Sequence, residues 1–362
     1  MIRIAAVGHG DIARRRHFLD LEELGGRAQL VAIAGRDESS LERTAHQFGV
    51  PGWYTDADEM LGREDIDAVL VLTPPISHGR FAKKAIEAGK HVLVEKPLVM
   101  TLEEAAELLE ALKAQQLKAP TTFMPLPDVE TPEHRLVARL LAEGIVGEAT
   151  SVECHLGHRG PTHADWFYRQ ALAGGGVLFD LGIYAVSAVV SLLGPARTVT
   201  ALCSRHFDVR TMDDGTVVEP DVEDSALVNL WLDNNTAVTI NANWNGYVTH
   251  HETRSRVTVI GREGSLHFGV ADGGIYVHRA DNDYGRITAP SEEAHFDGYP
   301  CRRIDSQTSA SPATIVGNFV TMIEGGETSV RPLEMQVHVM EIIFEAYRSG
   351  AANGVRTLTT RF

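Results

Sequence analysis

Cysteine is scarce in this chain. Cys154, Cys203 and Cys301 form an odd, widely spaced set without a Cys-x-x-Cys pair. This pattern argues against a disulfide framework and against a zinc knuckle. We therefore expect a protein of a reducing, cytoplasmic compartment that carries no structural metal ion.

Basic residues and long apolar runs are also in short supply. The chain has 33 Lys and Arg against 49 Asp and Glu, and the resulting net charge of -16 would repel a nucleic-acid backbone or an anionic membrane. Its one tight basic run, residues 14–16, flanks a glycine-rich turn and suits a local phosphate or a solvated helix face. No uninterrupted apolar stretch approaches the length of a membrane span, and residues 2–7 read as a strand rather than as an export signal. We expect neither a nucleic-acid nor a membrane partner.

What remains is an ordinary globular composition in a chain long enough for two domains. With 362 residues, 44% of them hydrophobic, the chain exceeds what one hydrophobic core usually organises. Its first 120 residues alternate short apolar runs with helical patterns, as parallel strands joined by crossover helices do. The expected strands are residues 2–7, 30–34, 68–72, 91–95 and 121–124. Helices are expected to begin near Ser39 with Glu42, near Ser77, and near Thr101 with Glu104.

A proline-bearing polar stretch after residue 120 marks the expected domain boundary, which gives a Rossmann domain at 1–122 and an α+β domain at 123–362. Residues 224–233 and 236–245 read as a hairpin around Asn234-Asn235, and residues 257–260 and 265–268 as two further strands. Helical patterns at 180–193, 312–324 and 333–348 would cover one face of this open, mainly antiparallel sheet. The other face is expected to join subunits in a homodimer or homotetramer.

A glycine fingerprint follows the first expected strand. Gly8, Gly10, Asp11, Ile12 and Ala13 fit a G-x-G-x-x-A turn that leads into a helix, where backbone amides and the helix N-terminus can hold a diphosphate. The alternative is a tight structural turn. The surrounding strand-helix-strand pattern favours dinucleotide binding.

The end of the second strand bears on the choice of dinucleotide. An NAD site usually places an acidic residue there for the ribose hydroxyls, but this chain has Gly35 followed by Arg36. A guanidinium there could pair with a 2'-phosphate, so we favour NADP over NAD. Asp37 turning inward and a solvent-facing Arg36 are the alternatives.

Two further segments carry candidate catalytic groups. Glu95, Lys96 and Pro97 end an apolar strand, where open α/β sheets bind ligands, and a lysine buried beside a nicotinamide could exchange a proton with a hydroxyl. Asp180 and Tyr184 lie four residues apart at a helix start after three glycines, so their side chains share a face. Taken singly, each segment has a purely structural alternative. Lys96 could be a surface lysine, and Asp180 with Tyr184 could be a carboxylate at a helix N-terminus beside a packed aromatic ring.

In combination these segments resemble the Gfo/Idh/MocA family, the relatives of glucose-fructose oxidoreductase and inositol dehydrogenase. The resemblance rests on Ala-Gly-Lys-His-Val-Leu-Val before Glu-Lys-Pro and on Gly-Gly-Gly-x-x-x-Asp-x-Gly, and it extends to Thr73-Pro74 with His78 and to residues 144–147. It covers nearly the whole chain and is specific for the family but not for a substrate.

The resemblance also implies roles for individual residues. Lys96 would transfer the proton with Asp180 as its partner, and Glu95 to Pro97, Thr73, Pro74 and His78 would contact the cofactor. Most members have His where this chain has Tyr184; the Tyr form is similar to the glucose-fructose oxidoreductase and dimeric dihydrodiol or xylose dehydrogenase branches, which implies a Lys96–Tyr184 acid-base pair. Residues 124–127, Met-Pro-Leu-Pro, depart from the usual Arg-Phe-x-Pro region.

A segment rich in histidine and aromatic residues precedes the glycine triplet. From it we select His155, Arg159 and Trp166 as substrate contacts, since an indole can stack on a sugar ring. A metal site is the weaker alternative because the histidine spacing matches no tight zinc pattern, and a loop with exposed histidines is the bland one.

The sequence therefore predicts an NAD(P)-dependent oxidoreductase that acts on a sugar, cyclitol or related polyol. Two alternatives remain: a glycosidase that retains its dinucleotide and uses transient oxidation, as some relatives do, and a non-catalytic cofactor-bound regulator. The substrate itself depends on the shape of the pocket rather than on a motif.

Overall fold

The chain forms two compact units. The computed structural model describes residues 1–127, 131–245, 255–269, 274–285, 287, 289–296, 298–304, 314–327 and 330–362. One unit comprises Met1–Asp128 and Ala313–Met340, and the other Val129–Pro312 and Glu341–Phe362. The expected boundary after residue 122 thus lies inside the first segment of the first unit. The expectation also assigned 313–340 to the second domain, whereas this segment groups with the first.

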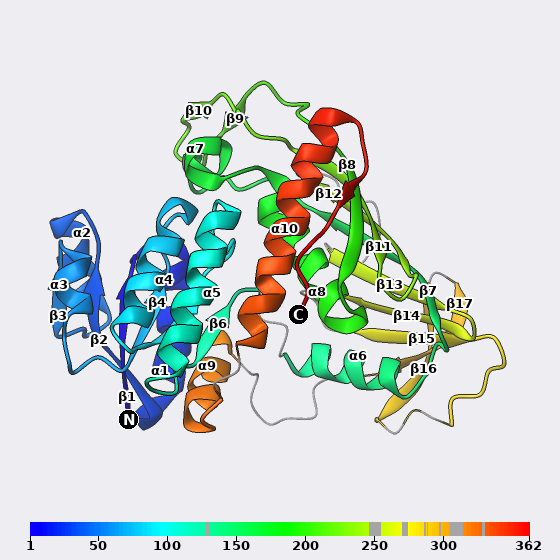
Figure 1. Cartoon of the computed structure of the whole chain (residues 1–362), viewed down its shortest axis with the longest axis horizontal. Helices are drawn as coiled ribbons and strands as arrows, with labels where there is room; N and C mark the ends of the chain where they lie inside the picture. The colour runs from blue at the N-terminus through cyan, green and yellow to red at the C-terminus, as the bar shows by residue number, and fades with distance from the viewer. Residues whose placement is uncertain are drawn as a thin grey trace. The chain divides into compact units, whose positions relative to one another are not determined.

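The first unit is built on a parallel sheet, which has six strands among the described residues, in the order β3-β2-β1-β4-β5-β6. The five expected strands are present with small changes at their ends, and β3 was missed because three residues are too few to show a periodicity. The strands are β1 (Ile2–Val7), β2 (Ala28–Ala34), β3 (Gly52–Tyr54), β4 (Ala68–Val71), β5 (His91–Val94) and β6 (Phe123–Pro125). The helices are α1 (Phe18–Glu23), α2 (Glu38–Gln47), α3 (Ala57–Leu61), α4 (His78–Glu87), α5 (Leu102–Gln116) and α9 (Ile315–Glu324) (Figure 1).

Helix starts in this unit follow local hydrogen bonding. The Thr101–Glu104 capping box of α5 is confirmed. The expected Ser39 cap of α2 is wrong: the cap is Asp37, whose carboxylate accepts a hydrogen bond of 2.7 Å from the amide of Ser40. Ser77 precedes α4 but makes no side-chain cap, because its hydroxyl bonds to Thr73 Oγ1 at 2.7 Å.

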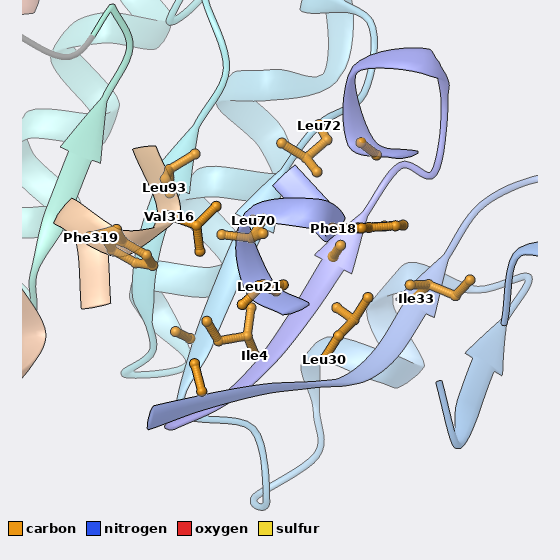
Figure 2. Packing of buried hydrophobic residues seen from close by; sticks show 14 of the residues in the cluster. Ile4, Phe18, Leu21, Leu30, Ile33, Leu70, Leu72, Leu93, Val316 and Phe319 are labelled. Atoms are coloured by element: carbon orange, nitrogen blue, oxygen red, sulfur yellow. The ribbon is translucent and has the colours of Figure 1, made fainter. Parts of the chain in front are cut away.

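The core of the first unit joins residues from both of its segments. Ile4, Leu70 and Leu93 from the sheet pack in one buried cluster with Phe18, and Val316 and Phe319 of α9 belong to the same cluster (Figure 2). An ion pair of 2.6 Å between Arg27 and Glu324 also ties α9 to this unit. Burial of these apolar side chains is the main stabilising term.

The second unit contains a mainly antiparallel sheet, as expected. Within the described residues it has ten strands in the order β16-β17-β15-β14-β13-β7-β12-β11-β8-β18, and β7 with β12 is its parallel pair. The strands are β7 (Ala149–Gly157), β8 (Ala196–Ser204), β11 (Ser225–Leu232), β12 (Ala237–Asn243), β13 (Ser255–Gly261), β14 (Gly264–Gly269), β15 (Ile275–Arg279), β16 (Ser291–Phe296), β17 (Tyr299–Ile304) and β18 (Arg356–Thr357). Two short strands, β9 (Arg210–Thr211) and β10 (Val217–Val218), form a separate ribbon.

Alternation along the strands separates the two faces of this sheet. Val152, Cys154 and Leu156 of β7 are buried, and β7 contacts α8 (Ile183–Leu193). The opposite face carries exposed apolar side chains, including Leu202 and Leu227, which lie directly opposite each other in the β8–β11 register. The other helices of this part of the chain are α6 (Pro132–Ala142), α7 (Gln170–Ala173) and α10 (Arg331–Ala352), which runs through the change of unit at residue 340.

One helical segment of the second unit is unusually apolar. Gln170–Leu193 is long and apolar enough to cross a bilayer by length and composition, although Asp180 interrupts its apolar run. In its most apolar window 67% of the residues are buried inside the protein. That is the environment of a core helix.

Candidate functional site

The predicted cofactor residues of the first unit gather at one edge of its sheet. Carboxyl ends of parallel strands share an edge, and ligands of such sheets bind where the strand order reverses, here between β1 and β4. Gly8 follows β1, Gly35 follows β2, Thr73 lies just after β4, and Glu95 follows β5. The fold therefore brings these four positions to the edge that the sequence predicted.

The glycine turn has one packed side and one open side. Gly8 has φ +98°, and a Cβ there would lie 2.6 Å from the carbonyl oxygen of Leu72, so no larger residue fits. A Cβ on Gly10 would meet no heavy atom within 4 Å, and the Ile12 side chain is 40% exposed although it is apolar. Ala13 is buried, and Asp11 pairs with Arg15 at 2.8 Å. The open side fits a diphosphate beside the start of the helix.

The end of β2 holds a histidine that the sequence did not single out. A Cβ on Gly35 would lie 2.5 Å from Cδ2 of His9, so the His9 ring fills the place of the missing side chain. Burial, followed by the charge of Arg14, lowers the pKa of His9 despite an opposing effect of Asp37. Arg36 is exposed, whereas the carboxylate of Asp37 caps α2. A signal existed in the sequence, because a glycine after a buried strand leaves room for a neighbouring ring.

His78 links two turns at this edge. It is 1% exposed, with Nδ1 2.7 Å from the carbonyl oxygen of Pro97 and Nε2 2.6 Å from that of Thr73. Burial lowers the pKa of His78, and the contacts to Pro97 and Thr73 oppose this shift. The ring therefore supports both turns, and the cofactor contact that the resemblance implied for His78 stays a prediction.

Glu95 is also engaged inside the first unit. Its Oε1 lies 2.8 Å from Nε2 of the fully buried His17, and its Oε2 accepts a hydrogen bond of 3.0 Å from the amide of Lys96. Burial raises the pKa of Glu95, but the hydrogen bond and charge of His17, together with Lys96, outweigh burial and bring the pKa to about 2. Glu95 is therefore an anion whose carboxylate holds the turn, and the half-buried Lys96 follows it.

In the second unit, the glycine triplet is shaped by Glu223. The Glu223 carboxylate accepts hydrogen bonds from the amides of Gly176, at 2.9 Å, and Leu178, at 3.0 Å, and from the hydroxyl of Tyr347, at 2.7 Å. A Cβ on Gly176 would lie 1.9 Å from the carbonyl oxygen of Glu223. The glycine is required by this close approach. The chain continues directly into a π-helical turn, Leu178–Gly182, which carries Asp180.

Asp180 has neighbours that the sequence did not predict. Nε1 of Trp244 donates to Asp180 Oδ2 at 3.3 Å, and Nε2 of His158 lies 3.6 Å from the same oxygen. Residues 175–190 are described throughout, and within them only Asp180, Leu181 and Tyr184 are not buried. The helix thus leaves Asp180 and Tyr184 on its least buried side. Trp244 directly follows the strand β12, and this position gave no signal in the sequence.

The three expected substrate contacts are differently placed. His155 alternates with Cys154 and Leu156 in β7, so its side chain lies on the face of the sheet opposite to those buried residues. Arg159 is exposed, and Trp166 stacks on Phe167 with ring centroids 3.8 Å apart. Their role as substrate contacts stays a prediction.

The arginine beside Trp244 is Arg210 rather than Arg159. It donates to the carbonyl oxygens of Trp244, at 3.1 Å, and Arg159, at 3.2 Å, and pairs with Asp224 at 3.5 Å. Burial raises the pKa of Asp224, but its hydrogen bonds to His206 and Phe207 and the charge of Arg210 lower it overall. Arg210 therefore belongs to a buried polar cluster next to the Asp180 partner Trp244.

Two other expectations concern the middle of the chain and metal binding. Met124 and Pro125 lie in the buried strand β6, and residues 128–130 of the region that departs from the family pattern lie outside the described residues. Across the described ranges, no group of three or more His, Cys, Asp or Glu residues is placed to hold a metal ion.

Two family models match separate parts of the chain. Residues 2–122 match the model of an oxidoreductase family with an NAD-binding Rossmann fold, and residues 134–267 match the C-terminal domain model of the GFO/IDH/MocA group. An uncharacterised oxidoreductase of Synechocystis sp. is 31% identical over 258 residues, 69% of this chain and 67% of the relative. A dTDP-3,4-didehydro-2,6-dideoxy-alpha-D-glucose 3-reductase of Actinomadura kijaniata is 35% identical over 57% of this chain and 60% of the relative.

Solved structures show the same fold. Levoglucosan dehydrogenase in complex with NADH superposes with a TM-score of 0.83 over 99% of both chains at 20% identity. An aldose-aldose oxidoreductase from Caulobacter crescentus complexed with glycerol gives 0.78 over 99% of both chains at 21% identity. The matched curated relatives are covered over about two thirds of their length or less. The family models, the identity and the fold together show that the chain belongs to the Gfo/Idh/MocA family of oxidoreductases.

Proposed function

We propose that this protein is an NAD(P)-dependent dehydrogenase or reductase that interconverts an alcohol and a carbonyl on a sugar, cyclitol or related polyol. The observation that carries the proposal is the shared sheet edge: Lys96 follows β5 at the same edge where the turn at Gly10 is open. The similarity to a dTDP-sugar 3-reductase and to levoglucosan dehydrogenase supports a carbohydrate substrate.

The chemistry that we propose divides between cofactor and protein. The bound nicotinamide supplies hydride transfer at a substrate carbon. Lys96 takes the hydroxyl proton when the alcohol is oxidised and returns it when the carbonyl is reduced. The Tyr184 hydroxyl donates a hydrogen bond to the same substrate oxygen, and Asp180, held by Trp244, orients the neighbouring polar groups.

The test of this proposal is the Lys96→Ala variant. Wild type is assayed with NADPH and NADH against a panel of keto-sugars and aldoses by nicotinamide absorbance. Lys96→Ala should lower kcat by about 10²–10⁴-fold, the usual contribution of a proton-transferring group, with little change in cofactor Kd. Lys118→Ala, at an exposed lysine of the same unit, is the matched control. Turnover like that of wild type in Lys96→Ala would refute the assignment.

The same assay separates the alternatives. Cleavage of a glycoside without net change of the cofactor would indicate a glycosidase that retains its dinucleotide. Tight cofactor binding without turnover of any substrate would indicate a regulator.

We infer a preference for NADP over NAD from the end of β2. The inference is supported by Arg36, which is exposed and follows a glycine. It is also supported by Asp37, whose carboxylate caps α2 and is therefore engaged by the amide of Ser40. Arg36→Ala should weaken NADPH binding at least tenfold, about 1.4 kcal/mol, and leave NADH binding unchanged. Equal losses for the two cofactors would contradict the preference.

We further infer that copies of the chain associate through the open face of the second sheet, as a homodimer or homotetramer in the cytoplasm. The paired Leu202 and Leu227, exposed by 64% and 42%, support an interface. All three cysteines lie in described segments and are free thiols, which supports a reducing compartment. Light scattering on wild type and Leu202→Lys should show dissociation of the variant; a monomeric wild type would refute this inference.

A further inference from the structure

A buried histidine lies directly behind the glycine turn. The helix that follows Gly10 contains a π-helical turn, Ala13–His17. Such turns are rare in proteins, and those that occur often lie at functional sites. This turn ends at His17, which is fully buried and reaches Glu95, 78 residues further along the chain, at 2.8 Å. Within the described part of the chain, Nδ1 of His17 has no hydrogen-bond partner. A buried polar atom without a partner lowers the stability of the folded protein by about 1–3 kcal/mol. An apolar residue at position 17 would avoid this penalty.

What His17 holds is the carboxylate next to Lys96. One oxygen of Glu95 faces His17, and the other accepts the amide of Lys96 at 3.0 Å. The charges of His17 and Lys96 both lower the pKa of Glu95, and the charge of His17 also opposes the effect of burial on the pKa of Asp20. A single anionic side chain therefore connects the π-helical turn to the backbone of Lys96.

A second buried histidine holds the other end of the same turn. Nδ1 of His78 lies 2.7 Å from the carbonyl oxygen of Pro97, and its Nε2 faces Thr73 on the neighbouring turn. The charge of Glu95 raises the pKa of His78 and that of Lys96 lowers it, both less than burial does. Lys96 thus lies between two residues, Glu95 and Pro97, each fixed by a buried imidazole.

We propose that His17 and His78 are positioning residues for Lys96: they hold the Glu95–Pro97 turn, and the hydrogen bond of His17 engages the Glu95 carboxylate next to Lys96. The inference rests on the proposed role of Lys96 in proton transfer. If the hydrogen bond from His17 is lost, the Glu95 carboxylate acts on Lys96 alone and favours its ammonium form, which cannot accept a proton.

The test measures the Lys96 amine directly, without cofactor, substrate or turnover. The full chain is labelled briefly with acetic anhydride at a series of pH values, and acetylation of Lys96 is quantified by peptide mass spectrometry. In His17→Leu the midpoint of labelling should rise by about 1 pH unit, the low end of the effect of a nearby opposite charge. His17→Gln, which keeps an N–H donor at the same reach, should recover at least half of this shift.

A double-mutant cycle distinguishes charge coupling from general damage. Glu95→Gln should lower the midpoint relative to wild type, and His17→Leu should have no further effect when combined with it. Equal midpoints in wild type and His17→Leu would overturn the proposal. If His17→Leu does not fold, an unchanged midpoint in Glu95→Gln overturns it equally.

Activity gives a second readout. His17→Leu and His78→Leu should each lower kcat about tenfold with unchanged NADPH Kd, and His78→Asn, which keeps a donor toward Pro97, should restore most of the loss. Full activity in both leucine variants would also overturn the proposal. If Lys96→Ala itself retains activity, the proposed function fails, whereas the labelling series still reports the coupling of His17, Glu95 and Lys96.

Discussion

The two glycines of the fingerprint turn should respond in opposite ways to the same added methyl group. In Gly8→Ala the new Cβ would lie 2.6 Å from the carbonyl oxygen of Leu72 and 2.9 Å from the amide nitrogen of Thr73, at a φ of +98°. A left-handed alanine costs about 1–2 kcal/mol, and overpacking against backbone about 1–3 kcal/mol. We expect Gly8→Ala to lower the free energy of unfolding by about 2–5 kcal/mol.

Gly10→Ala should leave the fold intact and affect the cofactor. Its Cβ would meet no protein atom within 4 Å, so the free energy of unfolding should change by less than about 1 kcal/mol. The methyl group would enter the space that we assign to the diphosphate. We expect NADPH binding to weaken at least tenfold, about 1.4 kcal/mol.

The assay pairs two measurements on each variant. Urea unfolding followed by circular dichroism gives the stability, and titration of NADPH fluorescence gives the Kd. Gly10→Ala with the Kd of wild type would show that the diphosphate does not lie beside Gly10. Gly8→Ala with the stability of wild type would refute the packing argument.

Two further predictions concern the second unit. Burial lowers the pKa of His134 to about 4, so its neutral form is favoured in the folded protein, and the stability it contributes is present above pH 6.5 and lost as the pH falls toward 4. Between pH 7 and 4.5 wild type should lose about 2 kcal/mol more than His134→Gln in urea unfolding; equal losses would contradict the burial of the ring. Glu223→Gln places an amide N–H against a backbone amide of Gly176 or Leu178 and should cost about 1–3 kcal/mol. Because these bonds shape the turn that carries Asp180, kcat should also fall while NADPH Kd is unchanged, and a variant with the kcat of wild type would separate Glu223 from the site.

Much of the first unit was readable from local pattern. Strands buried on both faces gave continuous apolar runs, and the capping box at Thr101 and Glu104 depends on four consecutive residues, so both were predicted. The Ser39 cap failed because Asp37, two residues earlier, also offers an acceptor and adopts an extended backbone before the helix. The division of the chain failed at residues 313–340, because the burial of Val316 and Phe319 against residues some 300 positions away leaves no local trace.

In the candidate site, too, residues within local motifs were predicted and residues defined by distant contacts were missed. Lys96, Asp180 and Tyr184 were selected because short motifs with fixed spacing point to them. His17, Trp244 and Arg210 were missed as site residues because each is defined by a partner far away in the sequence: Glu95 for His17, Asp180 for Trp244, and Asp224 for Arg210.

By itself, the sequence determined the family and the parallel order of strand and helix, and it selected the candidate catalytic side chains, since periodicity, caps and motifs act over a few residues. Only the tertiary structure decided which groups surround those side chains. A hydrogen bond or an ion pair depends on distance in space, and here the imidazoles that fix Glu95 and Pro97 reach them from helices 78 and 19 positions away.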